Sequence, residues 1–533
     1  MDIYMVYCKK QADTSGFIAI VGAGLAGLTA AYQLQLAGIK SIIYEASHRL
    51  GGRVYSGQFP NGQVYERAGE FIDETHYELL ALALKFNLSM EDLTALGSKE
   101  DLKTNVIEYP DTLTTTNIQT KIVTYTTQEA AVDYFNTINQ DTCQSIYQQV
   151  VNDFLTTYPT NLTRYRTPWP LIHKDQMITQ KIDDISLDEY INRITACLRK
   201  DGIGSKTKLA QLFKTCFTVQ FGSECKYQSP FNFIHLMGKQ REPLDYAAGK
   251  VPVALFELFG SQNERYRING GNSRLIEKLS SSLEKSNNYN VIKSCRLTTL
   301  RHCSEYSSFD QHGNKPYELT FQMADSSLIN RIHQHVILTI PFASIRPSNN
   351  IDISNASFSK LKLHAIQNLP MGKNVKSTYQ LKKAHWNNPV IQALKINSDF
   401  QLVYEGDYSD MFETKTIVSL SGGDANDNLK KNLVINHSDV IHEQVSDNWK
   451  DSIWQHGSYS FWGTGQYTGT PNSGDHHAFI GYEGVPEPYN TKQTGNCHFA
   501  GEHTSFQYPG LMNGAVESGQ RVAIEIIRSL DNR

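Results

Sequence analysis

A glycine-rich turn near the start of the chain constrains its fold more than any other feature. Residues 17–21 are apolar and β-branched and predict a buried strand, whereas residues 25–37 are rich in Ala and Leu and predict a helix. Between them stand Gly22, Gly24 and Gly27, in the spacing Gly-x-Gly-x-x-Gly. In such a unit the first glycine permits the tight turn, the second lets the backbone approach a pyrophosphate, and the third lets the helix pack on the strand.

The next segment completes a βαβ unit. Residues 40–45 (KSIIYE) predict a second strand, which ends in Glu45. A carboxylate at this place can accept hydrogen bonds from both hydroxyls of an adenosine ribose, and it would repel the 2′-phosphate of NADP. The N-terminus of the intervening helix would face the diphosphate. The pattern therefore predicts a dinucleotide-binding domain rather than an ordinary glycine-rich turn.

The composition narrows the class of protein further. With 533 residues, 40% of them hydrophobic, the chain can bury a large core and is expected to form two or three domains. Its net charge of -4 gives no electrostatic reason to expect a nucleic-acid partner. The eight cysteines are scattered, without the paired spacings of a zinc site, so we expect no metal.

The sequence favours a soluble protein. The apolar run at 17–31 follows Lys9 and Lys10, but it continues into the βαβ unit, which cleavage of a signal peptide would destroy. No apolar stretch is long enough to cross a bilayer, so we expect no membrane partner. The compartment stays open between the cytoplasm and secretion after removal of a leader. A homo-oligomer such as a dimer is compatible with the sequence.

A second glycine turn follows the second strand directly. Residues 46–56 (ASHRLGGRVYS) contain Arg49, Gly52 and Arg53. A nicotinamide enzyme does not need this segment, whereas a flavin dinucleotide lying across the sheet needs a turn under its pyrophosphate and an arginine that offers bidentate hydrogen bonds. Residues 21–56 resemble the N-terminal signature of the flavin amine oxidase family, which includes monoamine, polyamine and L-amino acid oxidases. This resemblance implies FAD as the cofactor.

Later segments resemble the same family in chain order. Residues 265–284 and 335–345 are similar to its returns into the flavin domain, and the intervening strand should place Leu297 or a neighbour against the adenine. The C-terminal helix would direct its N-terminus at the flavin and stabilise the negative charge that develops there on reduction. The version of the family motif at residues 69–73 (GEFID) is closer to bacterial L-amino acid oxidases than to the monoamine oxidases. The resemblance implies further FAD-binding residues at 69–71 and 501–512: Gly69, Glu70, Phe71, Gly501, Glu502, Gly510, Leu511 and Met512.

The resemblance also implies catalytic residues. In the family a Gly-x-x-x-Lys element delivers a lysine that holds a water against flavin N5, and here Gly372 leads to Lys376. Trp462 and Tyr459, in the aromatic segment 451–469, would flank the substrate amine. This segment has no cysteine, whereas monoamine oxidases attach FAD through one, so noncovalent FAD is expected.

The implied reaction is oxidation of a carbon that bears a primary amine: hydride transfer to the flavin, hydrolysis of the imine, and reoxidation by O2 to hydrogen peroxide. We expect L-amino acids as substrates, giving 2-oxo acids and ammonia. Many L-amino acid oxidases clamp the substrate carboxylate with an arginine, but Ile72 occupies that place here. A monoamine or polyamine oxidase, or a tryptophan 2-monooxygenase-like enzyme, is therefore the alternative. The candidate carboxylate ligands are Gln228, Arg241, Gln507 and Tyr508.

The expected fold is an α/β FAD-binding domain of the Rossmann-like, glutathione-reductase type, with a mixed-sheet substrate-binding domain and a helical subdomain. The helical subdomain is expected from polar stretches of helical period. The expected bounds are residues 1–76, 264–345 and 480–533 for the FAD-binding domain, 77–127, 215–263 and 346–479 for the substrate-binding domain, and 128–214 for the helical subdomain.

Overall fold

The structure of the chain is a computed structural model. The described residues contain no helix that is long and apolar enough to cross a membrane. The structure describes residues 16–93, 104–108, 123–126, 185–196, 200–230, 232–234, 265–286, 289–306, 310–369, 371–383, 392–396, 398–406, 414–433, 453–462, 484–488, 495–505 and 508–531.

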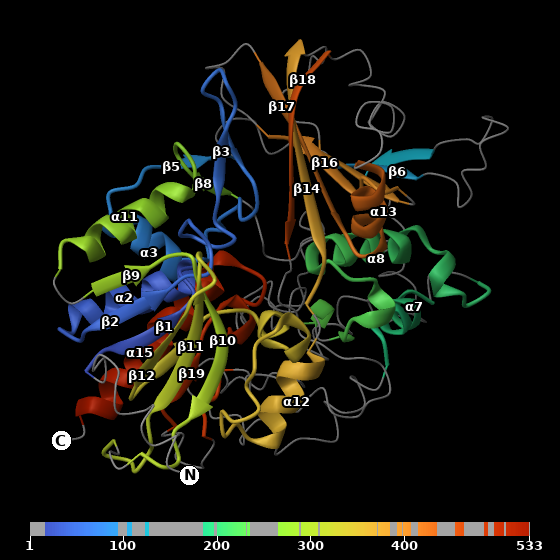
Figure 1. The fold of residues 1–533 in the computed structure, drawn as a ribbon. Coiled ribbons are helices and arrows are strands. Elements are labelled where there is room, and N and C mark those ends of the chain that lie inside the picture. The colour runs from blue at the N-terminus through green and yellow to red at the C-terminus, as the bar shows by residue number, and fades with distance from the viewer. Residues whose placement is uncertain are drawn as a thin grey trace, which may run out of the picture.

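A five-stranded parallel sheet organises one half of the molecule, at the lower left of Figure 1. Four of its strands, β1, β2, β13 and β19, are short and entirely buried, as expected for a parallel sheet covered on both faces, whereas the edge strand β9 is partly exposed. The order β19-β13-β1-β2-β9 places the first strand of the chain at the centre and the last one at an edge. The strands are β1 (Ile18–Val21), β2 (Ser41–Tyr44), β9 (Tyr289–Ile292), β13 (Val336–Leu338) and β19 (Cys497–Phe499).

Helices cover one face of this sheet. The helix that follows the glycine turn is buried on most sides, because the C-terminal helix packs closely along it: a Cβ at Gly519 would lie 2.5 Å from the carbonyl oxygen of Ala26. The residues between these helices form one hydrophobic core. The helices are α2 (Leu25–Leu36), α3 (Tyr77–Lys85), α11 (Ser273–Glu284) and α15 (Met512–Asp531).

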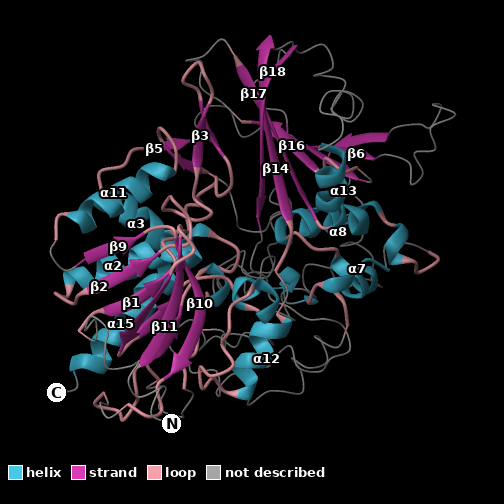
Figure 2. Ribbon diagram, in the orientation of Figure 1, coloured by secondary structure: helices cyan, strands magenta, loops and turns pink. Residues whose placement is uncertain are grey.

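An antiparallel three-stranded sheet belongs to a second core, on the other side of β1 and β2 (Figure 2). The ring of Tyr44 stacks on Phe321 with a centroid distance of 4.2 Å, and its hydroxyl lies 2.9 Å from Nε2 of His333. This second core also receives the short helices after β13. The elements are β10 (Cys295–His302), β11 (Tyr317–Met323), β12 (Leu328–His333), η6 (Phe342–Ile345), η7 (Pro347–Asn349) and α12 (Lys360–Asn368).

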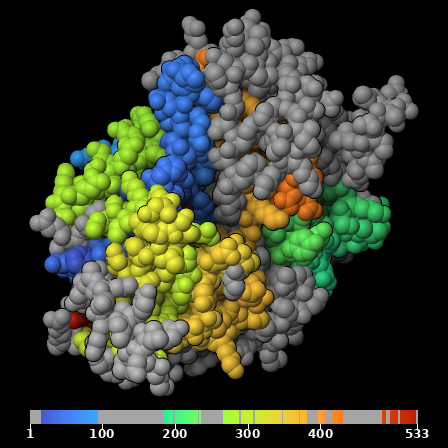
Figure 3. Space-filling model, in the orientation of Figure 1, coloured from blue at the N-terminus to red at the C-terminus, as the bar shows by residue number. Residues whose placement is uncertain are grey.

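A seven-stranded mixed sheet forms the other half, in the order β18-β14-β17-β16-β15-β6-β7. Helices α7 and α8 pack beside it around a third core. In the space-filling view the gold segments around α12 adjoin the green segments around α8 (Figure 3). The elements are β6 (Thr104–Glu108), β7 (Val123–Thr126), α7 (Leu187–Thr195), η4 (Gly204–Lys206), α8 (Lys208–Phe221), η5 (Cys225–Tyr227), β14 (Asn374–Lys383), β15 (Gln392–Ile396), β16 (Leu402–Glu405), β17 (Lys415–Gly422), α13 (Asp424–Leu433) and β18 (Ile453–Trp462).

Two small two-stranded ribbons accompany the three larger sheets of the described residues. Strand β3 (Ser56–Gln58) pairs with β4 (Val64–Glu66), and β5 (Met90–Asp92) pairs with β8 (Tyr266–Ile268). A short helix, η9 (Glu502–Thr504), follows β19.

The helical subdomain expected over 128–214 lies outside the described residues as far as residue 184. The boundary expected between residues 214 and 215 falls inside the continuous helix α8, whose buried side pairs with α7 in a single core. A cut at that point would divide the helix, so we propose that residues from 185 onward group with the mixed sheet.

Candidate active site

The first glycine turn has the backbone that a diphosphate site needs. Gly22 has a φ of +106°, and a Cβ there would lie 2.6 Å from Oγ1 of Thr339. A Cβ at Gly27 would clash with the carbonyl oxygen of Gly22, so the third glycine lets α2 pack on β1. A Cβ at Gly24 would meet no atom within 4 Å, and Gly24 caps α2 without a side-chain hydrogen bond. The second glycine thus adjoins open space at a helix N-terminus, where an anion is stabilised.

Glu45 is held in a fixed orientation at the end of β2. Its Oε2 accepts a hydrogen bond of 2.6 Å from the backbone N–H of Ala23, and its Oε1 accepts one of 2.8 Å from the N–H of Ser47. Each carboxylate oxygen keeps a further lone pair for another donor. The carboxylate can therefore accept hydrogen bonds from ribose hydroxyls while it keeps its hydrogen bonds to Ala23 in the first glycine turn and to Ser47 after β2.

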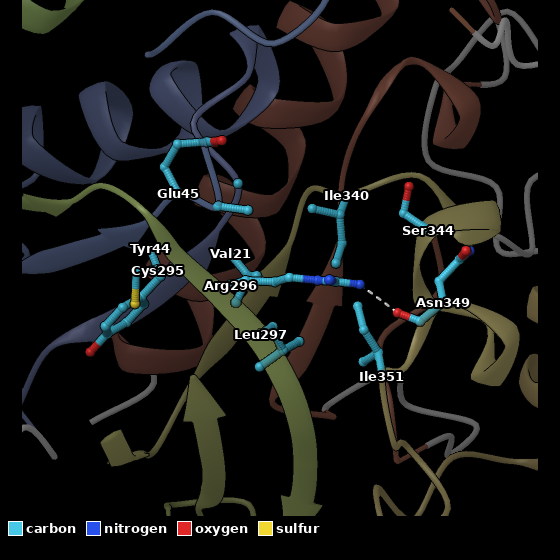
Figure 4. Close-up of a pocket in the computed structure, with 12 residues that line it drawn as sticks. Val21, Tyr44, Glu45, Cys295, Arg296, Leu297, Ile340, Ser344, Asn349 and Ile351 are labelled. Atoms are coloured by element: carbon cyan, nitrogen blue, oxygen red, sulfur yellow. Dashed lines mark hydrogen bonds between the residues drawn. The ribbon is translucent and has the colours of Figure 1, made fainter. Parts of the chain in front are cut away.

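A cavity of about 390 Å³ opens beside Glu45 (Figure 4). Leu297 of β10 contributes to its lining. The contact with adenine expected from Leu297 or a neighbour stays a prediction. The guanidinium of Arg296 extends along the cavity and donates a 2.6 Å hydrogen bond to the carbonyl oxygen of Asn349. The cavity combines an apolar wall with the Glu45 carboxylate, which suits the adenosine part of a dinucleotide.

The second glycine turn lies directly against the first. Gly24 and Gly51 form a parallel β-bridge, and a Cβ at Gly52, whose φ is +57°, would lie 3.2 Å from the Cα of Gly24. Arg49 is positioned by this turn: it donates to the carbonyl oxygen of Gly52 at 2.7 Å and lies 4.1 Å from the ring centre of Tyr55. Its expected contact with a pyrophosphate stays a prediction.

Arg53 connects the second glycine turn to the C-terminal signature. Its Nη1 donates to Oε1 of Glu502 at 2.6 Å, and the other carboxylate oxygen accepts from the backbone N–H of Gly510 at 2.6 Å. Burial raises the pKa of Glu502, but the charge of Arg53 and the surrounding donors outweigh burial, so that the pKa is lowered. Gly501 has a φ of +128°, and a Cβ there would collide with the ring of His503.

The start of α15 touches the segment after β4. A Cβ at Gly69 would lie 2.9 Å from Sδ of Met512, the first residue of the helix. Leu511 precedes that helix, and its N–H points to the carbonyl oxygen of Tyr508 at 3.3 Å. Two of the segments expected to approach the flavin thus meet in space, although the sequence separates them by more than 400 residues.

Lys376 extends from β14 to the same segment. It is buried, forms an ion pair with Oε2 of Glu70, and lies 3.4 Å from the carbonyl oxygen of Ala68. The carboxylate of Glu70 also accepts from Tyr404 at 2.7 Å and from Arg267 at 3.1 Å. Burial raises the pKa of Glu70, but the cations of Lys376 and Arg267 outweigh it, so the pKa is lowered and the carboxylate is charged at neutral pH.

Sequence reasoning missed several residues of this cluster. Arg267 and Asn272 lie within the family-like segment 265–284 but were not singled out in it, and Tyr404 lies in a strand that carries no motif. Asn272 fixes the segment by donating to the carbonyl oxygens of Gly69 (3.0 Å) and Glu70 (2.7 Å). Phe71, expected near the flavin, packs its ring 5.5 Å from that of Tyr404.

Two of the expected substrate-binding residues have their donors engaged elsewhere. Gln228 is fully buried, and its amide nitrogen donates to the carbonyl oxygens of Phe217 (3.0 Å) and Ser223 (2.5 Å). The hydroxyl of Tyr508 donates to the carbonyl oxygen of Thr75 at 3.0 Å. A carboxylate contact from Gln228 or Tyr508 would require one of these hydrogen bonds to be exchanged, and it stays a prediction.

The structure describes only some of the other residues that were expected to contact the substrate. Trp462 and Tyr459 lie in β18, in register with Asn374 and Ser377 of β14. Gln507 and Arg241 lie outside the described residues. Among the described residues, no group of three or more His, Cys, Asp or Glu side chains could hold a metal ion.

The residues present fit a bound flavin dinucleotide. The open space at Gly24 suits a pyrophosphate, the oriented carboxylate of Glu45 suits a ribose, and the cavity beside Leu297 suits an adenine. Lys376 and the start of α15 converge on the segment around Gly69, far along the chain from this end.

The sequence matches the family of flavin containing amine oxidoreductases over residues 25–527, and the chain belongs to this family. The resemblance expected from the glycine turns is thereby confirmed. FAD, the cofactor expected from the same turns, is confirmed as well.

Curated relatives act on different amines. Flavin-containing amine oxidase A of Sus scrofa is 22% identical, over 98% of this chain and 87% of its own length. An L-amino acid dehydrogenase of Synechocystis sp. is 39% identical over 17% of this chain, and an L-amino-acid oxidase of Vipera ammodytes ammodytes is 35% identical over 16%. The chain spans about a fifth of the length of these two L-amino acid enzymes.

Solved structures confirm the expected fold class. Putrescine oxidase bound to putrescine aligns with a TM-score of 0.65 at 15% identity, over 96% of this chain and 99% of that one. Cyclohexylamine oxidase from Brevibacterium oxydans aligns with a TM-score of 0.64 at 17% identity, over 97% of this chain and 100% of that one. At these identities the likeness establishes the fold.

Proposed function

We propose that this chain oxidatively deaminates L-amino acids to 2-oxo acids, with release of ammonia and hydrogen peroxide. The main support for amine oxidation is the contact of Lys376 with residues 68–70. Through this contact a buried cation from the mixed sheet reaches the segment that is expected to lie beside the flavin. Bound FAD supplies the hydride acceptor, held noncovalently. The substrate amine must be neutral before hydride departs, since an ammonium has no lone pair to assist.

The protein side chains contribute orientation and charge. Glu45 and the turn at Gly24 would anchor the adenosine diphosphate, so that the cofactor's reactive end reaches the region between Gly69 and β14. Lys376 would place a water or O2 next to its ammonium. The start of α15 would add the partial positive charge of a helix N-terminus at the same place.

Local similarity supports L-amino acids as the substrates. The aligned segments of the L-amino acid enzymes are 35–39% identical to this chain, whereas the alignment with amine oxidase A is 22% identical. These segments are short, so the substrate class depends on residues beyond them.

A monoamine or polyamine is the second candidate substrate, and the described site gives a specific reason for it. Ile72 occupies the place of the arginine that binds the substrate carboxylate in many L-amino acid oxidases. It is fully buried and donates its N–H to the carbonyl oxygen of Tyr266 at 2.8 Å. Gln228 and Tyr508 have no free donor. A substrate without a carboxylate needs none of these contacts.

Peroxide release from matched substrate pairs decides between the two candidates. Each pair consists of an L-amino acid and the amine left after removal of its carboxylate, such as phenylalanine with phenethylamine and ornithine with putrescine. D-amino acids serve as the stereochemical control. We expect turnover of L-amino acids and at least tenfold lower kcat/KM for the D-forms and the decarboxylated amines. Preference for the decarboxylated amines would replace L-amino acids by the second candidate.

A further inference from the structure

The carboxylate of Glu70 binds side chains from three different strands. Lys376 from β14 and Tyr404 from β16 both bind Oε2, and Arg267 from β8 binds Oε1 at 3.1 Å. The side chain of Glu70 is 5% exposed and that of Lys376 is 3% exposed. Water therefore screens this ion pair little, and each charge depends on its partner.

The two cations around Glu70 are not equivalent. Arg267 has a second carboxylate partner, because its Nη2 lies 3.0 Å from Glu91. Lys376 pairs only with Glu70 among the carboxylates that the structure describes within ion-pair distance. Glu66 is the other buried acid nearby, but it binds Ser56 and the N–H of Asn272, and burial raises its pKa.

Lysine needs such a partner in order to hold one position. Its ammonium is a point charge on a flexible four-carbon stem, so a fixed counterion decides where it stands. Glu70 is itself fixed by Tyr404 and Arg267, and its carbonyl oxygen accepts from Asn272. The ammonium is thus directed at the segment after β4, beside the carbonyl oxygen of Ala68.

We propose that Glu70 is a positioning residue: its carboxylate holds the Lys376 ammonium toward the flavin and offsets its charge, so that Glu70 lowers the reduction potential of the bound flavin. This inference rests on the proposed function only in placing the flavin beside Lys376. A negative charge near the ring disfavours its reduction and a positive charge favours it. The two members of the pair therefore have opposite effects on the potential.

The direction of each change in the flavin reduction potential can be measured on the FAD-loaded protein, by equilibrating the flavin with a redox dye. Glu70→Gln is expected to raise the two-electron potential, with about a tenfold change in the reduction equilibrium constant, which is ~30 mV. Lys376→Met is expected to lower it. The matched control is Glu91→Gln, which removes a carboxylate from the same network without touching Lys376 and should change the constant less than threefold.

A second pair of variants separates charge from position and from folding. Glu70→Asp keeps the charge but shortens the side chain, so the potential should stay near that of the wild type while reoxidation by O2 slows severalfold. If Glu70→Gln fails to retain FAD, the double variant Glu70→Gln/Lys376→Met should restore binding, because it removes the unpaired cation together with its counterion.

Three results would overturn the inference: an unchanged or lowered potential in Glu70→Gln, an equal shift in Glu91→Gln, or a double variant that remains colourless. None of these measurements uses an amine. Failure of every amine in the peroxide assay, with the signed shifts intact, would reject the proposed substrate class and leave the role of Glu70 standing.

Discussion

Arg53 and Glu502, which are 449 residues apart in the sequence, form an ion pair with a distance of 2.6 Å between Nη1 and Oε1. Arg53 belongs to the second glycine turn, and Glu502 follows the last strand of the parallel sheet. Glu502 also accepts from the N–H of Gly510, in the loop before α15. One carboxylate therefore joins the first and last segments of the cofactor-binding half.

Replacing the carboxylate of Glu502 should weaken its contacts with both Arg53 and Gly510. Glu502→Gln keeps the size of the side chain but leaves Arg53 without its counterion and Gly510 with a weaker acceptor. We expect a loss of roughly 2 kcal/mol in unfolding free energy, since Arg53 is one-third exposed and partly screened. Thermal unfolding with FAD bound measures it. Arg193→Gln, which breaks an exposed ion pair with Glu189, is the control and should change little. Equal effects of the two variants would contradict the structural importance of Glu502.

The two glycines Gly24 and Gly27 should respond differently to alanine. Gly27→Ala would force a Cβ against the carbonyl oxygen of Gly22 and should destabilise the protein whether or not FAD is bound. Gly24→Ala adds a Cβ in open space at an ordinary φ of -70°. It should leave the unfolding midpoint of the FAD-free protein unchanged but weaken FAD binding at least tenfold, because the methyl group occupies the approach of the pyrophosphate. Unaltered FAD affinity in Gly24→Ala would place the cofactor elsewhere.

Mild acid should destabilise the fold through its buried histidines. Burial lowers the pKa of His333, His335 and His503 to about 4, so these side chains stay neutral in the fold while the unfolded chain binds protons below about pH 6.5. Stability therefore falls as the pH drops from about 6.5 toward 4, by up to roughly 3 kcal/mol for each histidine. Glu66, whose pKa burial raises, acts in the opposite sense and softens the slope.

The unfolding midpoint measured between pH 7 and pH 4.5 tests this dependence. His333→Gln should make the slope shallower, even if the variant is less stable at every pH, because one of the three proton-binding differences is gone. A midpoint that does not change over this range would contradict the burial of these histidines.

Lys376→Met should slow the reoxidation of the flavin by O2 more than its reduction by the substrate. We expect reoxidation by O2 to slow by at least tenfold, because a buried ammonium stabilises the negative charge that develops on oxygen, whereas reduction by substrate should change less. Stopped-flow absorbance separates the two steps. The control is Lys373→Met, which removes an exposed lysine paired with Asp427 near the start of the same strand and should alter neither rate. Equal slowing of both steps in Lys376→Met would remove the lysine from this role.

Local backbone features could be predicted from the sequence. Gly22, Gly24, Gly27 and Glu45 lie within one βαβ unit, so their spacing alone determines their geometry. The family resemblance added the segments that return to the parallel sheet. From the same resemblance we expected Leu297 or a neighbour against the adenine, and Leu297 lines the cavity beside Glu45.

Contacts between distant strands could not be predicted in the same way. The cluster around Glu70 takes Arg267, Lys376 and Tyr404 from three strands, and nothing in their separate neighbourhoods indicates that they share one carboxylate. The surroundings of Gln228 could not be predicted from the sequence either. Its side chain is buried, and its amide nitrogen donates to the carbonyl oxygens of Phe217 and Ser223.

Anaerobic mixing of the purified, FAD-loaded protein with substrate tests the central claim most directly. We predict that an L-amino acid, or its decarboxylated amine, bleaches the flavin absorbance with one equivalent of substrate per flavin, and that admitting O2 restores the colour and produces one equivalent of hydrogen peroxide. A flavin that stays oxidised in the presence of every amine and amino acid would contradict amine oxidation as the function of this chain.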